Sequence, residues 1–190
     1  AHMSKARRAS NALDLLDHAM GLGAQTGLVL EFGVYSGQTI NHLAARSGGR
    51  KVYGFDSFEG LPEAWLPGFG AGAFRRTDLP AVAANVELVI GWFDRTLPTF
   101  LDARKGETVA LLHVDCDLYS STQTVFAQLA DRIVPGTIIV FDEYFNYPGW
   151  RDHEYKAFQE FAATRRIHYD YVGLVPGHQQ VAVRIVGIGG

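Results

Sequence analysis

The sequence predicts an α/β fold with a doubly wound, mostly parallel sheet, and three observations support this prediction. Short apolar runs alternate along the chain with stretches of helical periodicity. A turn bounded by Gly33 and Gly37 joins the first apolar run to a helical stretch. Acidic residues follow the ends of several apolar runs, at the edge where open α/β sheets bind their ligands.

The N-terminal part of the chain is expected to contain two helices around a buried strand. Apolar residues recur at helical spacing over Lys5–Met20, and Gly21 and Gly23 end this helix. The apolar run Leu28–Phe32 is short enough for a strand, and the helix that follows it extends to about Arg46.

Glu31 lies within this first strand, where a carboxylate is costly unless it finds a donor. A ligand with ammonium or hydroxyl groups would supply one. The following turn aims backbone N–H groups and a helix N-terminus at the strand ends. Its pattern, Gly33-x-x-x-Gly37, differs from G-x-G-x-x-G and disfavours a nicotinamide dinucleotide. An ordinary tight connection is the alternative.

The next two strands end in residues suited to a nucleoside. The strand Lys51–Phe55 leads into Asp56, whose two carboxylate oxygens suit the two ribose hydroxyls. The alternative is that Asp56 is the N-cap of a helix that begins at Ser57. The strand Val86–Ile90 leads into Gly91-Trp-Phe93, where an adenine would lie. The ring of that tryptophan offers a stacking face, and core packing explains it equally well.

A long irregular segment separates these two strands. Ser57–Pro62 is expected to form a turn, and Pro67–Leu79 has little periodicity but several glycines and aromatic residues. Such a loop in a compact domain is usually a lid or a disordered segment, and we expect a lid from Leu66 to Pro80.

Two later strands also end in acids. The run Val109–Asp117 contains Asp115 and ends in a second acid, and Thr137–Phe141 precedes Asp142 and Glu143. Carboxyl ends of parallel strands share one edge of a sheet. We therefore expect the following acids on one rim: Glu31, Asp56, Asp115, Asp117, Asp142 and Glu143.

Carboxylates gathered in this way raise one another's pKa, and a hard divalent cation removes the conflict. Oxygen ligands from Asp115, Asp142 and Glu143 would suit Mg²⁺, with Asp117 as the alternative to Asp115. If there is no metal, Asp117 caps a helix and Glu143 faces solvent. His113 lies in the middle of its strand and is expected in the core.

The C-terminal part is expected to form a helix and a hairpin. The helix spans Asp152–Ala163, and His153 and Glu154 at its start are expected to be exposed, with contact to the substrate as the alternative. The strands Tyr169–Val172 and Gln180–Val186 are separated by a turn containing Pro176 and Gly177. A hairpin makes the last strand antiparallel to its neighbour.

Composition narrows the class of protein. The chain of 190 residues suggests one domain, over residues 4–187, and residues 1–3 are interpreted as a cloning scar. The net charge of −3 gives no basic surplus for nucleic acid, and no apolar run is long enough for a membrane span. A lone cysteine indicates a reducing compartment, so we expect a cytoplasmic protein.

Several motifs together resemble the macrocin O-methyltransferase family, from about Leu28 to Ile185. The matching segments are Glu31-Phe-Gly-Val-Tyr-Ser-Gly37, Gly54-Phe-Asp-Ser-Phe-Glu-Gly-Leu-Pro62, Gly91-Trp-Phe93, Val114-Asp-Cys-Asp-Leu-Tyr-Ser-Ser-Thr122 and Phe141-Asp-Glu-Tyr144. Members are metal-dependent class I S-adenosylmethionine (SAM) enzymes that methylate hydroxyls, often on natural-product sugars. The resemblance implies a Rossmann-like, seven-stranded sheet with an antiparallel last strand.

The resemblance also implies roles for individual residues. Asp115, Asp142 and Glu143 match the metal-ligand acids, although the last of these positions is commonly aspartate in the family. Asp115 is the candidate base and also borders the cofactor. The implied SAM-binding residues are Glu31, Gly33, Tyr35, Ser36 and Gly37 for the methionine part, Asp56 and Ser57 for the ribose, and Gly91 and Trp92 for the adenine.

The predicted function is therefore a SAM-dependent and Mg²⁺-dependent transfer of a methyl group to a hydroxyl of a small molecule, such as a natural-product sugar or vicinal diol. Two alternatives stay open: a metal-independent SAM methyltransferase acting on a carboxyl or peptide, and a non-catalytic nucleotide-binding module. No nucleic-acid or membrane partner is expected, and a homo-oligomer stays open.

Overall fold

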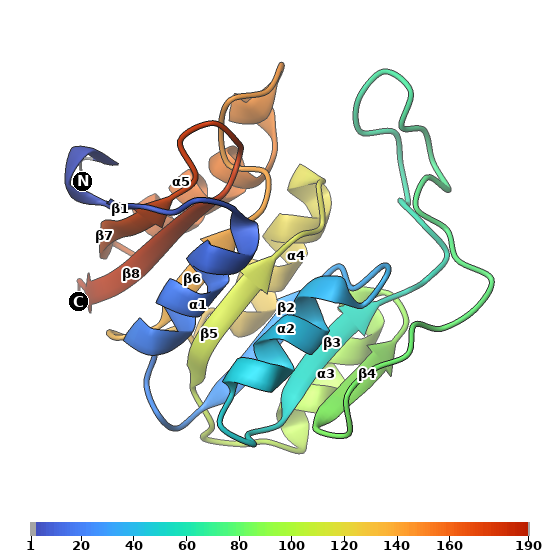
Figure 1. Ribbon diagram of the computed structural model, residues 1–190, viewed down its shortest axis with the longest axis horizontal. Helices are drawn as coiled ribbons and strands as arrows, with labels where there is room; N and C mark the ends of the chain where they lie inside the picture. Colours follow the sequence, from blue (N-terminus) through green and yellow to red (C-terminus); the bar gives the residue numbers. More distant parts are fainter. Residues whose placement is uncertain (1–2, 190) are drawn as a thin grey trace.

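One mixed sheet of eight strands runs through the molecule in the order β1-β7-β8-β6-β5-β2-β3-β4 (Figure 1). The computed structural model describes residues 3–189, so Ala1 and His2 of the expected cloning scar lie outside the described residues. The strands are β1 (Arg7–Arg8), β2 (Leu28–Phe32), β3 (Val52–Asp56), β4 (Val86–Ile90), β5 (Val109–Val114), β6 (Ile138–Phe141), β7 (Ile167–Leu174) and β8 (Val181–Ile188).

Helices cover both faces of this sheet, as predicted for a doubly wound fold (Figure 1). They are α1 (Ala12–Leu22), α2 (Gln38–Arg46), α3 (Phe93–Asp102), α4 (Tyr119–Leu129) and α5 (Glu154–Thr164), with short 3-10 turns η1 (Met3–Lys5) and η2 (Trp150–Asp152). Side chains of α1 and α2 pack into one hydrophobic core, and those of α3, α4 and α5 pack into another. The sheet separates the two cores, which is why its central strands are apolar on both faces.

The strand directions confirm the predicted topology. β2 pairs in parallel with β3 and β5, and β5 pairs in parallel with β6. β8 is antiparallel to both β6 and β7, so the last strand is the antiparallel one. The expected number of seven strands is corrected to eight, because Arg7–Arg8 forms a short edge strand parallel to β7.

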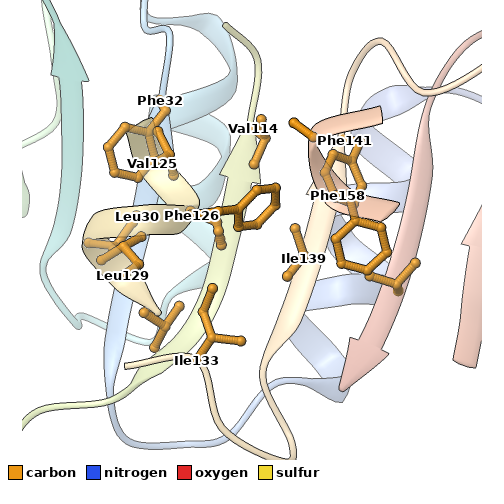
Figure 2. Packing of buried hydrophobic residues seen from close by; sticks show 14 of the residues in the cluster. Leu30, Phe32, Val114, Val125, Phe126, Leu129, Ile133, Ile139, Phe141 and Phe158 are labelled. Carbon is orange, nitrogen blue, oxygen red and sulfur yellow. The ribbon is translucent and has the colours of Figure 1, made fainter. Parts of the chain in front are cut away.

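The core on the α3–α5 face is rich in aromatic rings. Figure 2 shows Phe126 of α4 lying over the sheet beside Val114, with Phe158 of α5 next to Phe141 of β6. The ring centroids of Phe141 and Phe158 are 5.0 Å apart, and those of Phe126 and Phe158 are 5.9 Å apart. These contacts hold α4 and α5 against β5 and β6, whose carboxyl ends carry the predicted acids.

Two helices begin later than predicted because of local structure at their N-terminal ends. The helix expected over Lys5–Met20 begins only at Ala12, because the Asn11 side chain accepts a hydrogen bond from the Asp14 N–H and caps the helix there. The helix expected from Asp152 begins at Glu154, because η2 occupies the preceding residues.

The turn after β2 brings two strand ends into direct contact. Gly33 has a φ of +92°, and its N–H donates to the Phe55 carbonyl at 3.0 Å. A Cβ atom at this position would overlap the backbone carbonyl of Asp115. Glycine is therefore required here both by the backbone conformation and by the space available.

We expect Gly33→Ala to destabilise the protein by about 3 kcal/mol or more, since it combines a disfavoured φ with a backbone clash. Thermal or urea unfolding measures the change. Gly21→Ala is the matched control: Gly21 lies in α1 with open space around it, so alanine there should stabilise by about 0.5–1 kcal/mol. Equal stability of Gly33→Ala and the parent protein would contradict the contact between the two strand ends.

Candidate functional site

A cavity of about 450 Å³ lies at the carboxyl ends of the strands. It is bordered by the turns after β2, β3, β5 and β6, by the start of α3, by α4 and by the loop between β3 and β4. The residues that line it are Gly33, Tyr35, Asp56, Ser57, Gly60, Leu61, Pro62, Trp65, Phe74, Trp92, Phe93, Asp94, Asp115, Cys116, Asp117, Ser120, Ser121, Thr124 and Glu143.

The predicted site residues divide into two groups around this cavity. Those that line it are Gly33, Tyr35, Asp56, Ser57, Trp92, Asp115 and Glu143. Those that do not are Glu31, Ser36, Gly37, Gly91 and Asp142. The cavity wall therefore combines residues expected to bind the nucleoside with acids expected to bind the cation. The residues of the second group do not contribute to this wall.

Asp56 fastens the glycine turn to the end of β3. Its Oδ2 accepts hydrogen bonds from the N–H groups of Val34 and Tyr35, both at 2.9 Å, and its Oδ1 accepts one from Phe58 N–H at 2.7 Å. No helix begins at Ser57, so Asp56 does not act as the N-cap of a helix. The carboxylate borders the cavity while its backbone bonds hold the turn in place.

Glu31 finds its donors within the protein rather than requiring a ligand to supply one. The side chain is fully buried, accepts a hydrogen bond from Thr39 Oγ1 at 3.1 Å, and faces Nδ1 of His113 at 2.9 Å. Burial raises the pKa of Glu31, whereas the hydrogen bond from His113 opposes that rise. His113 is buried, as expected, but its ring faces a carboxylate rather than only apolar side chains.

Glu154 is a further acid at the site, and the expectation that it is exposed is wrong. Its side chain is fully buried at the start of α5. Its two oxygens accept from the N–H groups of Glu143 at 3.1 Å and Cys116 at 3.4 Å. Glu154 therefore ties together the segments that follow β5 and β6. The sequence offered one weak signal: an acid at the first turn of a helix beside an aromatic turn.

The acids at this edge perturb one another strongly. Burial and the neighbouring carboxylates raise the pKa values of Asp115, Glu143 and Glu154 well above the ordinary range. Burial and Asp142 raise the pKa of Asp117 to about 7. Carboxyl groups with such values sit where a positive charge is needed to keep them ionised near neutral pH.

Two buried polar atoms of residues that line the cavity, Glu143 Oε2 and Trp65 Nε1, have no hydrogen-bond partner among residues 3–189. Buried polar atoms normally find partners, so unpartnered ones at a cavity indicate a place for bound groups.

Among the described residues, side-chain atoms of His113, Asp115 and Asp142 lie within 4.8 Å of one another and could hold a metal ion. Asp142 Oδ1 also accepts a hydrogen bond from Gln180 Nε2 at 3.0 Å. Two of the three expected metal ligands belong to this group, and Glu143 does not. The donor set fits a divalent cation, since it offers carboxylate oxygens together with an imidazole nitrogen.

Trp92 faces the cavity rather than the core. It precedes α3 and lines the cavity, whereas the next residue, Phe93, packs edge-on against Phe32 with centroids 5.1 Å apart. Gly91 has a φ of +138°, which lets the chain turn at the end of β4. The alternative in which Trp92 fills the core is therefore not what the structure adopts.

The loop between β3 and β4, which projects away from the sheet in Figure 1, contributes Leu61, Trp65 and Phe74 to the lining of the cavity. The ring of Trp65 lies 6.0 Å from that of Tyr147, and Phe74 lies 5.8 Å from Tyr35. The Ser120 hydroxyl at the start of α4 donates to Glu63 at 2.5 Å. The part of the loop that lines the cavity begins before the expected lid, since Leu61 precedes Leu66.

A parallel sheet with a glycine turn at its centre, an antiparallel last strand and an acid-lined cavity at the strand ends is the arrangement of class I SAM-dependent methyltransferases. A family model described as a methyltransferase domain matches residues 30–144. The chain belongs to this methyltransferase-domain family.

The names of related proteins agree with the assignment to this family. Demethyldecarbamoylnovobiocin O-methyltransferase of Streptomyces niveus is 30% identical over 129 residues, which cover 57% of this chain and 48% of the relative. Mycinamicin III 3''-O-methyltransferase of Micromonospora griseorubida is 28% identical over 180 residues, covering 79% and 68%. The chain spans about half the length of the first two curated relatives that it matches.

Solved structures have the same fold. The calicheamicin methyltransferase CalS11 superposes with a TM-score of 0.71 at 25% identity, covering 90% of this chain and 76% of that one. The O-methyltransferase NovP superposes with a TM-score of 0.66 at 22% identity, covering 92% and 79%. Within residues 3–189, every helix is too short or too polar to cross a bilayer.

We expect the metal-free protein to lose stability as the pH rises from about 5 to 8. The raised pKa values mean that folded Asp115, Asp117 and Glu143 keep protons that the unfolded chain releases above its ordinary values of 3.8 and 4.5. The raised pKa of His113 acts in the same direction above 6.5. In chelator, the Tm should be lower at pH 8 than at pH 5.5 by about 5 °C or more.

A divalent cation at pH 8 should restore most of this loss, because it binds the ionised carboxylates of the folded state. The lowered pKa values of Asp14 and Asp17 act only at more acidic pH and leave this window unaffected. A Tm in chelator that stays constant or rises between pH 5.5 and 8 would contradict the assignment of a strained acidic cluster.

Proposed function

We propose that the protein is a SAM-dependent O-methyltransferase that acts on a hydroxyl of a small molecule and uses a divalent cation. The observation that carries the proposal is one cavity whose wall joins Asp56 and Trp92 to Asp115 and Glu143. One part suits a nucleoside and the other suits positive charge and hydroxyl groups. Membership of the methyltransferase-domain family supports the same conclusion.

We propose that the nucleoside part of SAM occupies the side formed by β2, β3 and β4. Trp92 would stack against the adenine beside Gly91, and Asp56 and Ser57 would accept the ribose hydroxyls. The methionine part would lie over the glycine turn. The residues proposed for that part are Gly33, Tyr35, Ser36 and Gly37, with Glu31 beneath them.

The acceptor is proposed to be a sugar hydroxyl of a natural product or a related vicinal diol. Relatives named for novobiocin, tetracenomycin and mycinamicin methylation support this class. The lining residues Leu61, Trp65 and Phe74 offer apolar contacts for the rest of such a molecule. Exclusion of water by the expected lid, Leu66 to Pro80, would favour methyl transfer, which depends mainly on positioning.

Asp115 is the proposed base. It lines the cavity, and its raised pKa suits a group that takes up a proton. The acceptor O–H proton passes to Asp115, the oxygen forms a bond to the methyl carbon, and the carbon–sulfur bond breaks to leave the neutral thioether S-adenosylhomocysteine. A bound cation would act as a Lewis acid on the acceptor oxygens. Mg²⁺ held by Asp115, Asp142 and Glu143 is the ion and ligand set implied by the resemblance.

We also propose that residues 4–187 act together as one catalytic domain. One sheet includes strands from Arg7 to Ile188, and no second sheet is present within residues 3–189.

Asp142→Asn should lower methyl transfer to a panel of deoxysugar acceptors by about 100-fold or more, because it removes a charged ligand of the cation. SAM affinity measured by calorimetry should change by less than about threefold, since Asp142 does not line the cavity. Asp170→Asn, at an exposed position on β7, is the matched control and should keep full activity.

The same assays separate the alternatives. Full activity of the parent protein in excess chelator would select a metal-independent methyltransferase. Binding of adenosine and NAD as tight as that of SAM, with no transfer to any acceptor, would favour a non-catalytic nucleotide-binding module. Loss of SAM binding in Asp142→Asn would contradict the role given to this residue.

Trp92→Ala should weaken SAM binding by about 10-fold, because stacking on a base contributes about 1–3 kcal/mol. Calorimetry with SAM measures the change. Trp150→Ala is the control, since Trp150 packs against Tyr155 and does not line the cavity. Unchanged SAM affinity in Trp92→Ala would place the adenine elsewhere.

A further inference from the structure

Glu31 and His113 form a buried pair between the two central strands of the sheet. They are direct partners in the parallel register of β2 and β5, so both side chains point to the same face. The His113 Nδ1 lies 2.9 Å from Glu31 Oε2, and the two side chains are 1% and 0% exposed. Thr39 Oγ1 holds the other oxygen of Glu31 at 3.1 Å. Thr39 and His113 therefore hold one oxygen each of the Glu31 carboxylate.

This contact determines which nitrogen of His113 is free. Because Nδ1 faces Glu31, Nε2 is the ring nitrogen that remains for another partner. The hydrogen bond that the described residues show for this ring is the one at Nδ1. A carboxylate that orients one imidazole nitrogen so that the other can bind a metal is a recurring arrangement in metalloproteins.

The imidazole of His113 lies beside two carboxylates. One side-chain atom each of His113, Asp115 and Asp142 lies within 4.8 Å of the others. Glu143 adds an independent observation: its side chain is 7% exposed and its Oε2 has no partner among the described residues. Burial, together with the neighbouring carboxylates, raises the pKa of Glu143. An uncompensated oxygen next to this group is the expected consequence of carboxylates gathered without a cation.

We propose that His113 is a nitrogen ligand of the cation site, together with Asp115 and Asp142, and that Glu31 positions its imidazole. The site then favours first-row divalent ions that accept a nitrogen ligand, such as Mn²⁺, Co²⁺ or Zn²⁺, over Mg²⁺. This inference deepens the proposed function and rests on the cation in it. It gives Glu31 a role beneath the metal, in place of contact with the methionine ammonium.

The register of the sheet explains why these residues meet. His113 and Asp115 alternate with Val114 along the end of β5, so both point to the α1–α2 side of the sheet. Asp142 follows β6, which pairs with β5 through His113 and Val140. Asp115 also lines the cavity, and so it links the buried group to the space proposed for the acceptor.

The test uses the full chain, freed of metal and loaded with Mn²⁺ alone, without SAM or acceptor. Pulsed electron paramagnetic resonance should show coupling of the Mn²⁺ to a ¹⁴N nucleus. Labelling only the histidines with ¹⁵N should convert this to a ¹⁵N coupling, which needs no variant and so does not depend on how a variant folds. Absence of any nitrogen coupling with Mn²⁺ bound at one equivalent would overturn the proposal.

Variants assign the coupling to one residue. His113→Gln should abolish it, and His168→Gln, at an exposed position on β7, should leave it intact. Glu31→Gln should keep the coupling but weaken Mn²⁺ binding by about 10- to 100-fold, as expected for loss of an orienting carboxylate. Near-ultraviolet circular dichroism verifies that each variant is folded. A coupling that survives in folded His113→Gln would overturn the assignment.

Metal preference provides a second measurement. Calorimetry on the metal-free protein should give Mn²⁺ an affinity at least about 10-fold higher than that of Mg²⁺, and folded His113→Gln should reduce this ratio. An equal affinity of both ions in the parent protein would contradict a nitrogen ligand. Methyl transfer without nitrogen coupling would overturn this inference alone, whereas nitrogen coupling without methyl transfer to any acceptor would overturn only the proposed function.

Discussion

The accumulation of buried carboxylates at one edge of the sheet is the constraint on which the rest of the site depends. Asp115, Glu143 and Glu154 are held where burial and mutual repulsion both oppose ionisation. His113 is the basic partner that the protein supplies from within, and Glu31 already engages it. Bound protons or cations reduce the electrostatic repulsion among these carboxylates and so stabilise the folded protein. A methyl transfer that moves a proton and uses a positively charged methyl donor brings both to this site.

The topology imposes this accumulation. Parallel strands all end at the same edge, so every acid that follows a strand is carried to one place. Close approach of the strand ends then requires special backbone positions: Gly33 lies directly on the Asp115 carbonyl, and Asp117 has a φ of +61°. Backbone N–H groups also stabilise the edge, since Asp56 holds the glycine turn and Glu154 holds the segments after β5 and β6. Some of the acids are thus structural connectors, and the others are left for ligands.

Periodicity alone predicted every strand except β1 and most helices, because the apolar runs of β2 and β5 have few other possible structures. It also predicted that Asp115 and Asp142 lie on one rim, because that follows from strand direction. It could not predict that Glu31 meets His113, since the contact depends on the register between β2 and β5. The burial of Glu154 depends on how α5 approaches the sheet, and the late start of α1 depends on the competition between a helix and an edge strand at Arg7. Each of these is decided by packing between distant parts of the chain.

The charge balance of methyl transfer connects the proposed chemistry with the proposed metal ligand. A sulfonium loses its positive charge when it gives up the methyl group, and the acid-lined cavity would then be less well compensated. The proton taken from the acceptor remains on Asp115, so the net charge within the cavity is unchanged by the transfer. A nitrogen ligand fits this balance, because neutral His113 holds a cation without adding another negative charge to a cluster that already contains several. Glu31 sets the orientation of that ligand, and Thr39 and the imidazole N–H compensate part of its own charge.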